Sequence, residues 1–223
     1  FKNRVFNKIS RTIFKKDIQD ILYKDYLKFD IRMAKLIKNG NIIVDSDTLL
    51  IGRNVMSLKT FTEVKKKGGK TILQSQWMHP LTHNQLLKKE FKKIGIVKEP
   101  IKSKRIDRQL SEINDVDFIW CISNLVKNSY LSNKVSERKL IDLSLGVDFE
   151  KYNASHIEKS HKRNEFVILF VGNVNAEKGA HILLEAVNKS GLQNIKIIFN
   201  GRIPEYFESV FNEQANKLIS KNI

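Results

Sequence analysis

The sequence predicts an α/β protein with two Rossmann-like parallel-sheet domains, the second of them incomplete. Short apolar runs rich in β-branched and aromatic residues recur along the chain, and this pattern is typical of buried parallel strands. Amphipathic stretches with helical spacing separate these runs. The hydrophobic pattern stops in a charged linker at about 150–164 and restarts at Phe166, so we expect two domains, 1–152 and 153–223.

Each element follows from its own residues. Strands are predicted at 41–44, 48–51, 70–74, 117–122, 140–143, 166–171 and 195–199. Helices are predicted at 15–27, 30–40, 57–68, 83–94, 104–114, 180–190 and 204–220, and one more begins at Ser123. Asp30, Ser57 and Ser123 are side chains that commonly cap the first turn of a helix. Glycines such as Gly95 and Gly191 are typical of the residue that follows the last turn.

Composition limits the classes of function. The 223 residues contain 40 Lys and Arg against 24 Asp and Glu, a net charge of +16, which favours phosphate-bearing partners. Arginines are not clustered among aromatic residues, and no zinc-finger pattern occurs, so we expect no nucleic-acid partner. A peripheral contact of Lys-rich helices with a membrane surface stays open.

The location is expected to be cytoplasmic. The chain has no apolar run of about 18 residues that could span a membrane. The single Cys121 lies in an apolar run and is expected to be buried and unpaired, which fits a reducing compartment. Because the chain begins with Phe1 and ends after a helix, we expect it to be part of a longer protein.

A glycine loop between a strand and a helix is the main candidate site. Strand 166–171 is followed at once by Gly172, a polar loop and a helix that begins near Ala180. The start of a helix favours an anion, and Lys178 adds a full positive charge beside it. A nucleotide diphosphate is the natural ligand for such a loop. The alternative is a structural turn whose lysine is merely solvated.

Three blocks in order resemble the family-4 glycosyltransferases, retaining enzymes of the GT-B fold. The first, LFVGNVNAEKGAHILLEAV (169–187), is similar to the segment that opens the family's donor domain. The second, LIDLSLGVDFEKY (140–152), is similar to its interdomain signature, and the third, DVDFIWCISNLVKNSYLSNKVSERKL (115–140), to the end of its acceptor domain. A fainter similarity covers 57–91, so the resemblance extends over roughly residues 29–211.

The resemblance implies a sugar transfer from a nucleotide-diphosphate sugar to a hydroxyl of a polysaccharide or lipid-linked glycan, with retention of configuration. It implies that Gly172 lets the donor diphosphate approach the backbone and that Lys178 neutralises charge on the leaving group. Asn173 stands where many members have Arg, so it offers a hydrogen bond without the charge. His79 matches the acceptor-domain His near the transferred sugar, although it could be an ordinary loop histidine before Pro80. The family needs no cofactor or metal.

Other readings remain open. The family's Glu-x7-Glu element, which contacts the donor sugar, is not recognisable, and we interpret Glu205 and Glu213 as a coincidental pair on a solvent-facing helix. Its first strand is also not recognisable before residue 29. A non-catalytic nucleotide- or sugar-binding fragment is therefore the main alternative. An NAD-type Rossmann enzyme is disfavoured, because G-x-G-x-x-G is absent after either leading strand.

Overall fold

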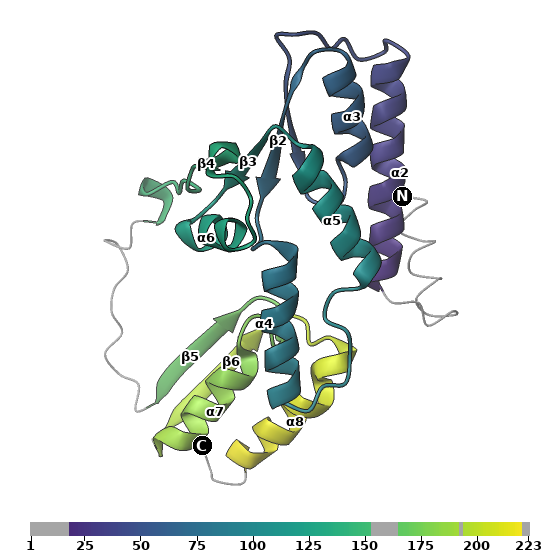
Figure 1. The fold of residues 1–223 in the computed structure, drawn as a ribbon. Coiled ribbons are helices and arrows are strands. Elements are labelled where there is room, and N and C mark those ends of the chain that lie inside the picture. Colours follow the sequence, from purple (N-terminus) through teal and green to yellow (C-terminus); the bar gives the residue numbers. More distant parts are fainter. Residues whose placement is uncertain (1–17, 153–164, 192–193, 220–223) are drawn as a thin grey trace. The chain divides into compact units, whose positions relative to one another are not determined.

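The structure is a computed structural model that describes residues 18–152, 165–191 and 194–219. It confirms the predicted α/β class, since helices alternate with strands and the strand pairs in the described residues are all parallel. The chain divides into two compact units (Figure 1). The first contains the described residues up to His83 together with Ile101–Gly146, and the second contains Asn84–Pro100 and the described residues from Val147 onwards.

The first unit is built on a four-stranded parallel sheet in the order β1-β2-β3-β4. Its strands are β1 (Leu49–Arg53), β2 (Lys70–Ser75), β3 (Phe118–Cys121) and β4 (Leu140–Asp142). Ile72 of β2 lies opposite Ile51 of β1 and Phe118 of β3. Because all four strands run in the same direction, their carboxyl ends meet at one edge of the sheet, where ligands of open α/β sheets usually bind.

The helices of the first unit are α2 (Ile18–Lys38), α3 (Leu58–Lys66), α5 (Ser103–Asp115), α6 (Asn124–Ser132) and the first turn of α4 (Pro80–Lys93). Of these, α3, α5 and α6 pack on the central strands, and α2 packs against α3. A short 3-10 turn at Glu137–Lys139 leads into β4. The core brings Phe61 of α3 and Tyr130 of α6 against Leu73 and Ile119 of the two central strands, and all four are fully buried.

The predicted helix start at Asp30 is wrong, because α2 continues through this residue without a break. Figure 1 shows α2 and α3 side by side, and the buried carboxylate of Asp30 accepts hydrogen bonds from the first turn of α3. The N–H groups of Lys59 and Thr60 donate to it at 2.9 and 2.8 Å. Ser57 immediately precedes α3, but its hydroxyl donates to the carbonyl of Arg53 instead of capping the helix. Asp30 is thus a cap for a neighbouring helix.

The strand predicted at 41–44 is also wrong. This segment has no strand partner, and Ile43 is 86% exposed. The N–H groups of Asn41 and Ile42 both donate to the carbonyl of Leu36, so these residues close the end of α2. The apolar pair Ile42-Ile43 resembles a short strand in sequence, but its backbone is used to end a helix.

The second unit has a two-stranded parallel sheet with both helices packed on one face. Its strands are β5 (Phe166–Val171) and β6 (Ile195–Asn200), and its helices are α7 (Ala180–Ser190) and α8 (Glu205–Ile219). A 3-10 turn lies at Glu150–Tyr152. The bounds of β5 and α7 are those predicted, and Gly191 follows α7 in the left-handed conformation with a φ of 66°. Ile168 and Ile195 face α7 and α8, whereas Leu169 and Val171 are largely exposed.

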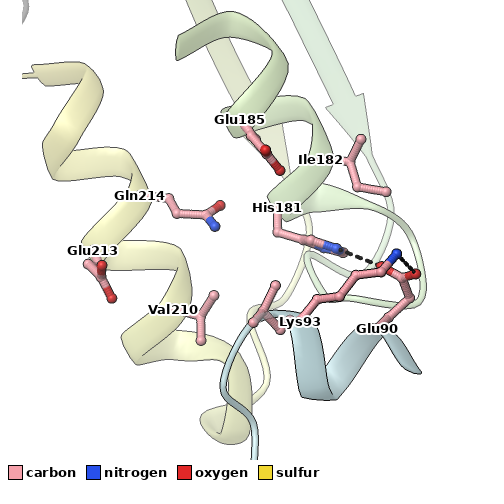
Figure 2. Close-up of a pocket in the computed structure, with 9 residues that line it drawn as sticks. Glu90, Lys93, His181, Ile182, Glu185, Val210, Glu213 and Gln214 are labelled. Atoms are coloured by element: carbon pink, nitrogen blue, oxygen red, sulfur yellow. Dashed lines mark hydrogen bonds and ion pairs between the residues drawn. The ribbon is translucent and has the colours of Figure 1, made fainter. Parts of the chain in front are cut away.

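All of α4 after its first turn belongs to this unit, although residues 84–100 were expected in the first domain. Phe91 is buried against Val174, Ala176 and Phe207. Gly95 ends the helix as predicted, with a φ of 72°, and directs the chain back over the same core. Together α4, α7 and α8 line a cavity of about 570 Å³, shown in Figure 2.

Two further sequence predictions concern the single cysteine and the presence of membrane-spanning helices. Cys121 is buried and free, as expected, and burial raises the pKa of its thiol to about 11. It is therefore protonated at neutral pH and behaves as a small core residue. Within the described residues, no helix combines the length and apolar character that crossing a membrane requires.

Candidate functional site

The structure brings Gly172, Asn173 and Lys178 together in the loop between β5 and α7. Gly172 has a φ of 129°, a conformation that side chains rarely adopt, and the space where a Cβ would lie is open. Asn173 and Lys178 are both exposed. The space beside Gly172 and these two polar side chains are therefore accessible at the carboxyl end of β5, while the Gly172 N–H itself donates to the carbonyl of Asn200 at 3.0 Å.

The segment between Asn173 and Lys178 is held in place by burial and by hydrogen bonds. Val174, Asn175 and Ala176 are buried, so the middle of the loop packs into the core while its two ends remain accessible. The Oδ1 atom of Asn175 accepts a hydrogen bond from the N–H of Lys178 at 2.9 Å, and the carbonyl of Asn175 accepts from Ala180 at 3.2 Å. This side-chain turn fixes the backbone just before α7 begins.

The electrostatics at this loop favour an anion. The backbone dipoles of the 11-residue α7 place partial positive charge at its first turn, and Lys178 adds a full charge two residues before the helix. The neighbouring Glu177 contributes a negative charge, which partly opposes this effect. Burial first and the charge of Glu177 second raise the pKa of the Tyr206 hydroxyl.

His79 lies in the loop at the carboxyl side of the sheet in the first unit, directly before Pro80 at the start of α4. Its side chain is only 3% exposed, and its ring meets the ring of Tyr130 edge-on at 5.3 Å. Its backbone N–H donates to the Ser129 hydroxyl at 2.8 Å, and its backbone carbonyl accepts from the N–H of His83 in the first turn of α4. Nδ1 is buried and has no hydrogen-bond partner among the described residues.

Desolvation lowers the pKa of His79 to about 4, so the imidazole is neutral at pH 7. A neutral ring with an unused nitrogen can exchange one hydrogen bond with a ligand hydroxyl. It cannot act as a cation at neutral pH. Since the side chain is 3% exposed and Nδ1 is buried, a ligand could reach this nitrogen only if neighbouring side chains moved.

The folded state is expected to lose stability in acid because of His79. As pH falls below 6.5, the unfolded chain binds a proton at this histidine, but the folded chain does not until about pH 4. The free energy of unfolding is therefore highest above pH 6.5, where the ring is neutral in both states. At pH 5 it is expected to be lower by about 2 kcal/mol. Urea unfolding of the native chain and His79→Asn at pH 7.5 and pH 5 measures this. If the free energy of unfolding fell equally in both proteins between pH 7.5 and pH 5, the prediction would be contradicted.

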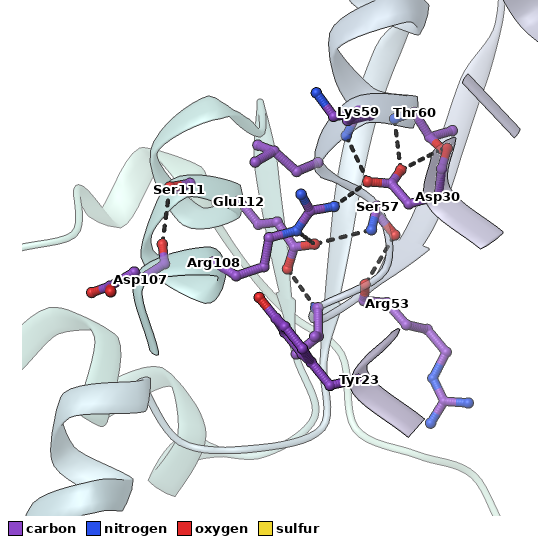
Figure 3. A network of polar contacts seen from close by, with 12 residues as sticks. Tyr23, Asp30, Arg53, Ser57, Lys59, Thr60, Asp107, Arg108, Ser111 and Glu112 are labelled. Carbon is purple, nitrogen blue, oxygen red and sulfur yellow. Dashed lines mark hydrogen bonds and ion pairs between the residues drawn. The ribbon is translucent and has the colours of Figure 1, made fainter. Parts of the chain in front are cut away.

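The neighbouring loop after β1 contains a strained residue that sequence reasoning missed. Val55 has a φ of 78°, which is unfavourable for a β-branched side chain, and it is buried. Glu112 of α5 holds this backbone: its carboxylate accepts from the N–H of Val55 at 2.5 Å and from that of Ser57 at 3.0 Å (Figure 3). Strained residues occur often in functional loops. Nothing in the local sequence around Val55 indicates this conformation.

A buried charge network supports the same loop. In Figure 3 the guanidinium of Arg108 lies between the carboxylates of Asp30 and Glu112. Asp30 and Glu112 have fully buried side chains, and that of Arg108 is 11% exposed. Burial raises the pKa of Glu112, while the two backbone N–H groups and Arg108 oppose this shift. The network has a structural role, since its partners are the start of α3 and the loop that precedes it.

The remaining histidines were expected on the surface or on helices. His83 stacks on Trp77 with a ring separation of 5.4 Å. His181 lies on a helix as expected, in the first turn of α7, and is buried there with 3% exposure. His156 and His161 lie outside the described residues. Glu205 and Glu213 are exposed on α8, in agreement with the interpretation of a solvent-facing pair.

With this geometry established, the chain was compared with known proteins. No protein-family model matches it, and no curated protein is significantly similar to it. The resemblance to family-4 glycosyltransferases therefore rests on the motifs alone. His79 belongs to the first unit and the three loop residues to the second. Among the described residues, no group of three or more His, Cys, Asp or Glu side chains is placed to hold a metal ion.

Proposed function

We propose that this chain binds a nucleoside-diphosphate sugar and belongs to a retaining glycosyltransferase of the GT-B type. The loop after β5 carries the proposal. It offers open space beside Gly172, whose own N–H is already donated to Asn200, together with an exposed Lys178 and the start of a helix. Buried Asn175 fixes this turn by accepting from the N–H of Lys178. A diphosphate needs such a combination of backbone N–H groups and positive charge.

Each loop residue has a proposed role. The Gly172 backbone approaches the diphosphate, and the Asn173 amide donates a hydrogen bond to it. Lys178 neutralises the charge that develops on the leaving diphosphate when the bond to the sugar breaks. Since the amide of Asn173 carries no charge, most of the electrostatic attraction in this loop depends on Lys178.

His79 is proposed to exchange a hydrogen bond with a sugar hydroxyl. Its neutral ring suits this role, because a neutral imidazole can accept a hydrogen bond as well as donate one. The acceptor hydroxyl is proposed to attack the same face of the sugar that the diphosphate leaves and to pass its proton to the departing diphosphate, which retains the configuration. No metal or other cofactor enters this proposal, since Lys178 and the helix start supply the positive charge.

The proposed acceptor is a polysaccharide or a lipid-linked glycan on the cytoplasmic side of a membrane. The surface of α2 supports a peripheral membrane contact, because exposed Lys28, Arg32 and Lys35 lie beside exposed Phe29 and Ile31. Cations next to apolar side chains suit an anionic bilayer surface. Flotation with anionic and neutral vesicles tests this contact, and equal recovery with both would argue against it.

Reversing the charge at Lys178 tests the diphosphate site. We expect the native chain to bind one of UDP, GDP and ADP in preference to the others. Lys178→Glu is expected to weaken this binding by roughly 10–100-fold, because it removes a charge-assisted contact of about 1.5–3 kcal/mol. Isothermal titration calorimetry measures both proteins.

Lys189→Glu is the matched control, since it makes the same charge change in the last turn of α7. It is expected to bind the nucleotide within about 2-fold of the native chain, because screening limits its effect. If Lys178→Glu binds the nucleotide as tightly as the native chain, the diphosphate does not bind at this loop.

A non-catalytic nucleotide- or sugar-binding module is the second candidate function. The observation that favours it is Asn173, which stands where an arginine would add a second positive charge. A module of this kind would bind the nucleotide through Lys178 without transferring sugar to any hydroxyl acceptor. Measuring donor consumption together with binding separates the two candidates.

A further inference from the structure

An exposed tryptophan lies at the carboxyl side of the sheet in the first unit. Trp77 follows β2 by two residues and is 42% exposed, although tryptophan side chains are on average highly buried. One face of its ring is stacked on the imidazole of His83, with the ring centroids 5.4 Å apart and the planes 13° from parallel. A large aromatic surface is therefore accessible at the edge where ligands of parallel sheets usually bind.

The turn that carries Trp77 is fixed by hydrogen bonds to buried groups. The backbone carbonyl of Trp77 accepts from the Ser75 hydroxyl at 2.8 Å, and that hydroxyl lies 2.7 Å from the hydroxyl of fully buried Tyr130. Two residues later, the backbone N–H of His79 donates to the hydroxyl of buried Ser129 at 2.8 Å. The backbone is thus held on both sides of Trp77, so its ring needs little further ordering when a ligand binds.

Polar groups with hydrogen-bonding capacity accompany this ring. Arg53, the last residue of β1, donates to the side-chain oxygen of Gln76 at 2.5 Å, and both residues are exposed. This bond leaves the amide NH2 group of Gln76 and further guanidinium N–H groups as donors. In the same turn, Nδ1 of His79 is buried without a hydrogen-bond partner among the described residues. An accessible aromatic surface with a few such polar groups is typical of a ligand site.

We propose that this turn binds a sugar ring of the acceptor glycan, with Trp77 as the stacking surface. The C–H groups on one face of a pyranose ring are apolar and weakly positive, so they pack against the negative face of an indole ring. The paired N–H donors of Gln76 and Arg53 suit neighbouring hydroxyls at the edge of the same sugar. The class of ligand rests on the proposed glycosyltransferase function, whereas its location rests on the geometry of the turn.

Titration with methyl glycosides tests the Trp77 site. The probes are the methyl α- and β-glycosides of glucose, galactose, mannose and N-acetylglucosamine. We expect at least one of them to bind saturably in the millimolar range and to shift the indole N–H resonance of Trp77 in NMR spectra of the whole chain. Calorimetry gives the affinities. Trp77→Ala is expected to weaken binding roughly 5–20-fold, because it removes the aromatic surface.

Trp120→Phe is the matched control, because Trp120 is the other tryptophan and its indole N–H donates to the carbonyl of Leu143. It is expected to bind the glycoside within about 2-fold of the native chain. Trp77→Phe keeps an aromatic face at the site and should retain the affinity within about 3-fold. Recovery in Trp77→Phe separates stacking from a general effect of the substitution on the fold.

Two results would overturn the Trp77 site. One is that none of the glycosides binds, or that Trp77→Ala binds them as tightly as Trp120→Phe does. The other is that a thymidine octanucleotide binds more tightly than every glycoside and loses this affinity in Trp77→Ala. The stacked group would then be a nucleobase and not a sugar.

The Trp77 site and the diphosphate site can fail independently. Lys178→Glu is expected to bind the glycoside as the native chain does, and Trp77→Ala is expected to bind the nucleotide as the native chain does. Nucleotide binding without glycoside binding would overturn the Trp77 site alone. Glycoside binding that depends on Trp77, without nucleotide binding, would support the Trp77 site and overturn the diphosphate site.

Discussion

Replacing Arg108 with methionine is expected to destabilise the first unit by about 3–5 kcal/mol. Methionine can fill much of the same space, but it leaves the carboxylates of Asp30 and Glu112 buried without their shared cation. Both side chains are fully buried, so water cannot replace the guanidinium without opening the core. The loss should be measured as the free energy of unfolding in urea.

The chain is well suited to this measurement. Its two tryptophans, Trp77 and Trp120, both belong to the first unit, so their fluorescence reports the unfolding of that unit alone. Arg105→Met is the control, because Arg105 lies one turn earlier on α5 and takes no part in the network. Its effect should stay within about 0.5 kcal/mol. Equal stabilities for the two variants would show that the network contributes little.

The pH dependence gives a second test of the same network. Burial already raises the pKa of Glu112, and Arg108 is one of the groups that oppose this shift. Without Arg108 the carboxyl should bind a proton at higher pH, which relieves the buried charge. Arg108→Met is therefore expected to lose less free energy of unfolding, relative to the native chain, as pH falls from 7 toward 5. For a variant that only lost packing, this difference would not change with pH.

Elements whose signals are local could be predicted from the sequence. The strand β5 and the helix α7 have the predicted bounds, because an apolar β-branched run, a glycine and an amphipathic helix follow one another directly. Gly172, Asn173 and Lys178 share one loop for the same reason, since they are close in sequence. Their proposed chemistry does not follow from this placement and needs the binding experiment.

Features that depend on distant partners could not be predicted. Asp30 has the residue type of a helix cap, but the helix that it caps is α3, which begins 28 residues later. The burial of His79 depends on Ser129 and Tyr130, about 50 positions away. The positive φ of Val55 depends on Glu112, 57 positions along the chain. Periodicity and capping rules describe neighbours in sequence and contain no information on such pairs.

Gly201→Ala is the second substitution with a large expected effect. An added Cβ at Gly201 would lie 2.6 Å from the carbonyl carbon of Gly172 and closer still to its oxygen. These are backbone atoms held by two hydrogen bonds, from Gly172 to Asn200 at 3.0 Å and from Val174 to Arg202 at 2.9 Å. The methyl group can be accommodated only if the ends of β5 and β6 move apart. We expect the free energy of unfolding of the second unit to fall by about 3 kcal/mol, which is at the upper end of the usual cost of overpacking.

Hydrogen exchange is the appropriate measurement for Gly201→Ala, because the second unit contains no tryptophan. Peptides covering 166–174 and 195–202 should exchange faster in the variant, and those of the first unit should not. Gly146→Ala is the control, since a Cβ there meets no atom within 4 Å. If the loop binds a diphosphate, nucleotide affinity should fall together with protection, because separating the strands moves Gly172. Faster exchange with unchanged affinity would mean that Gly172 shapes the fold but does not contact the ligand.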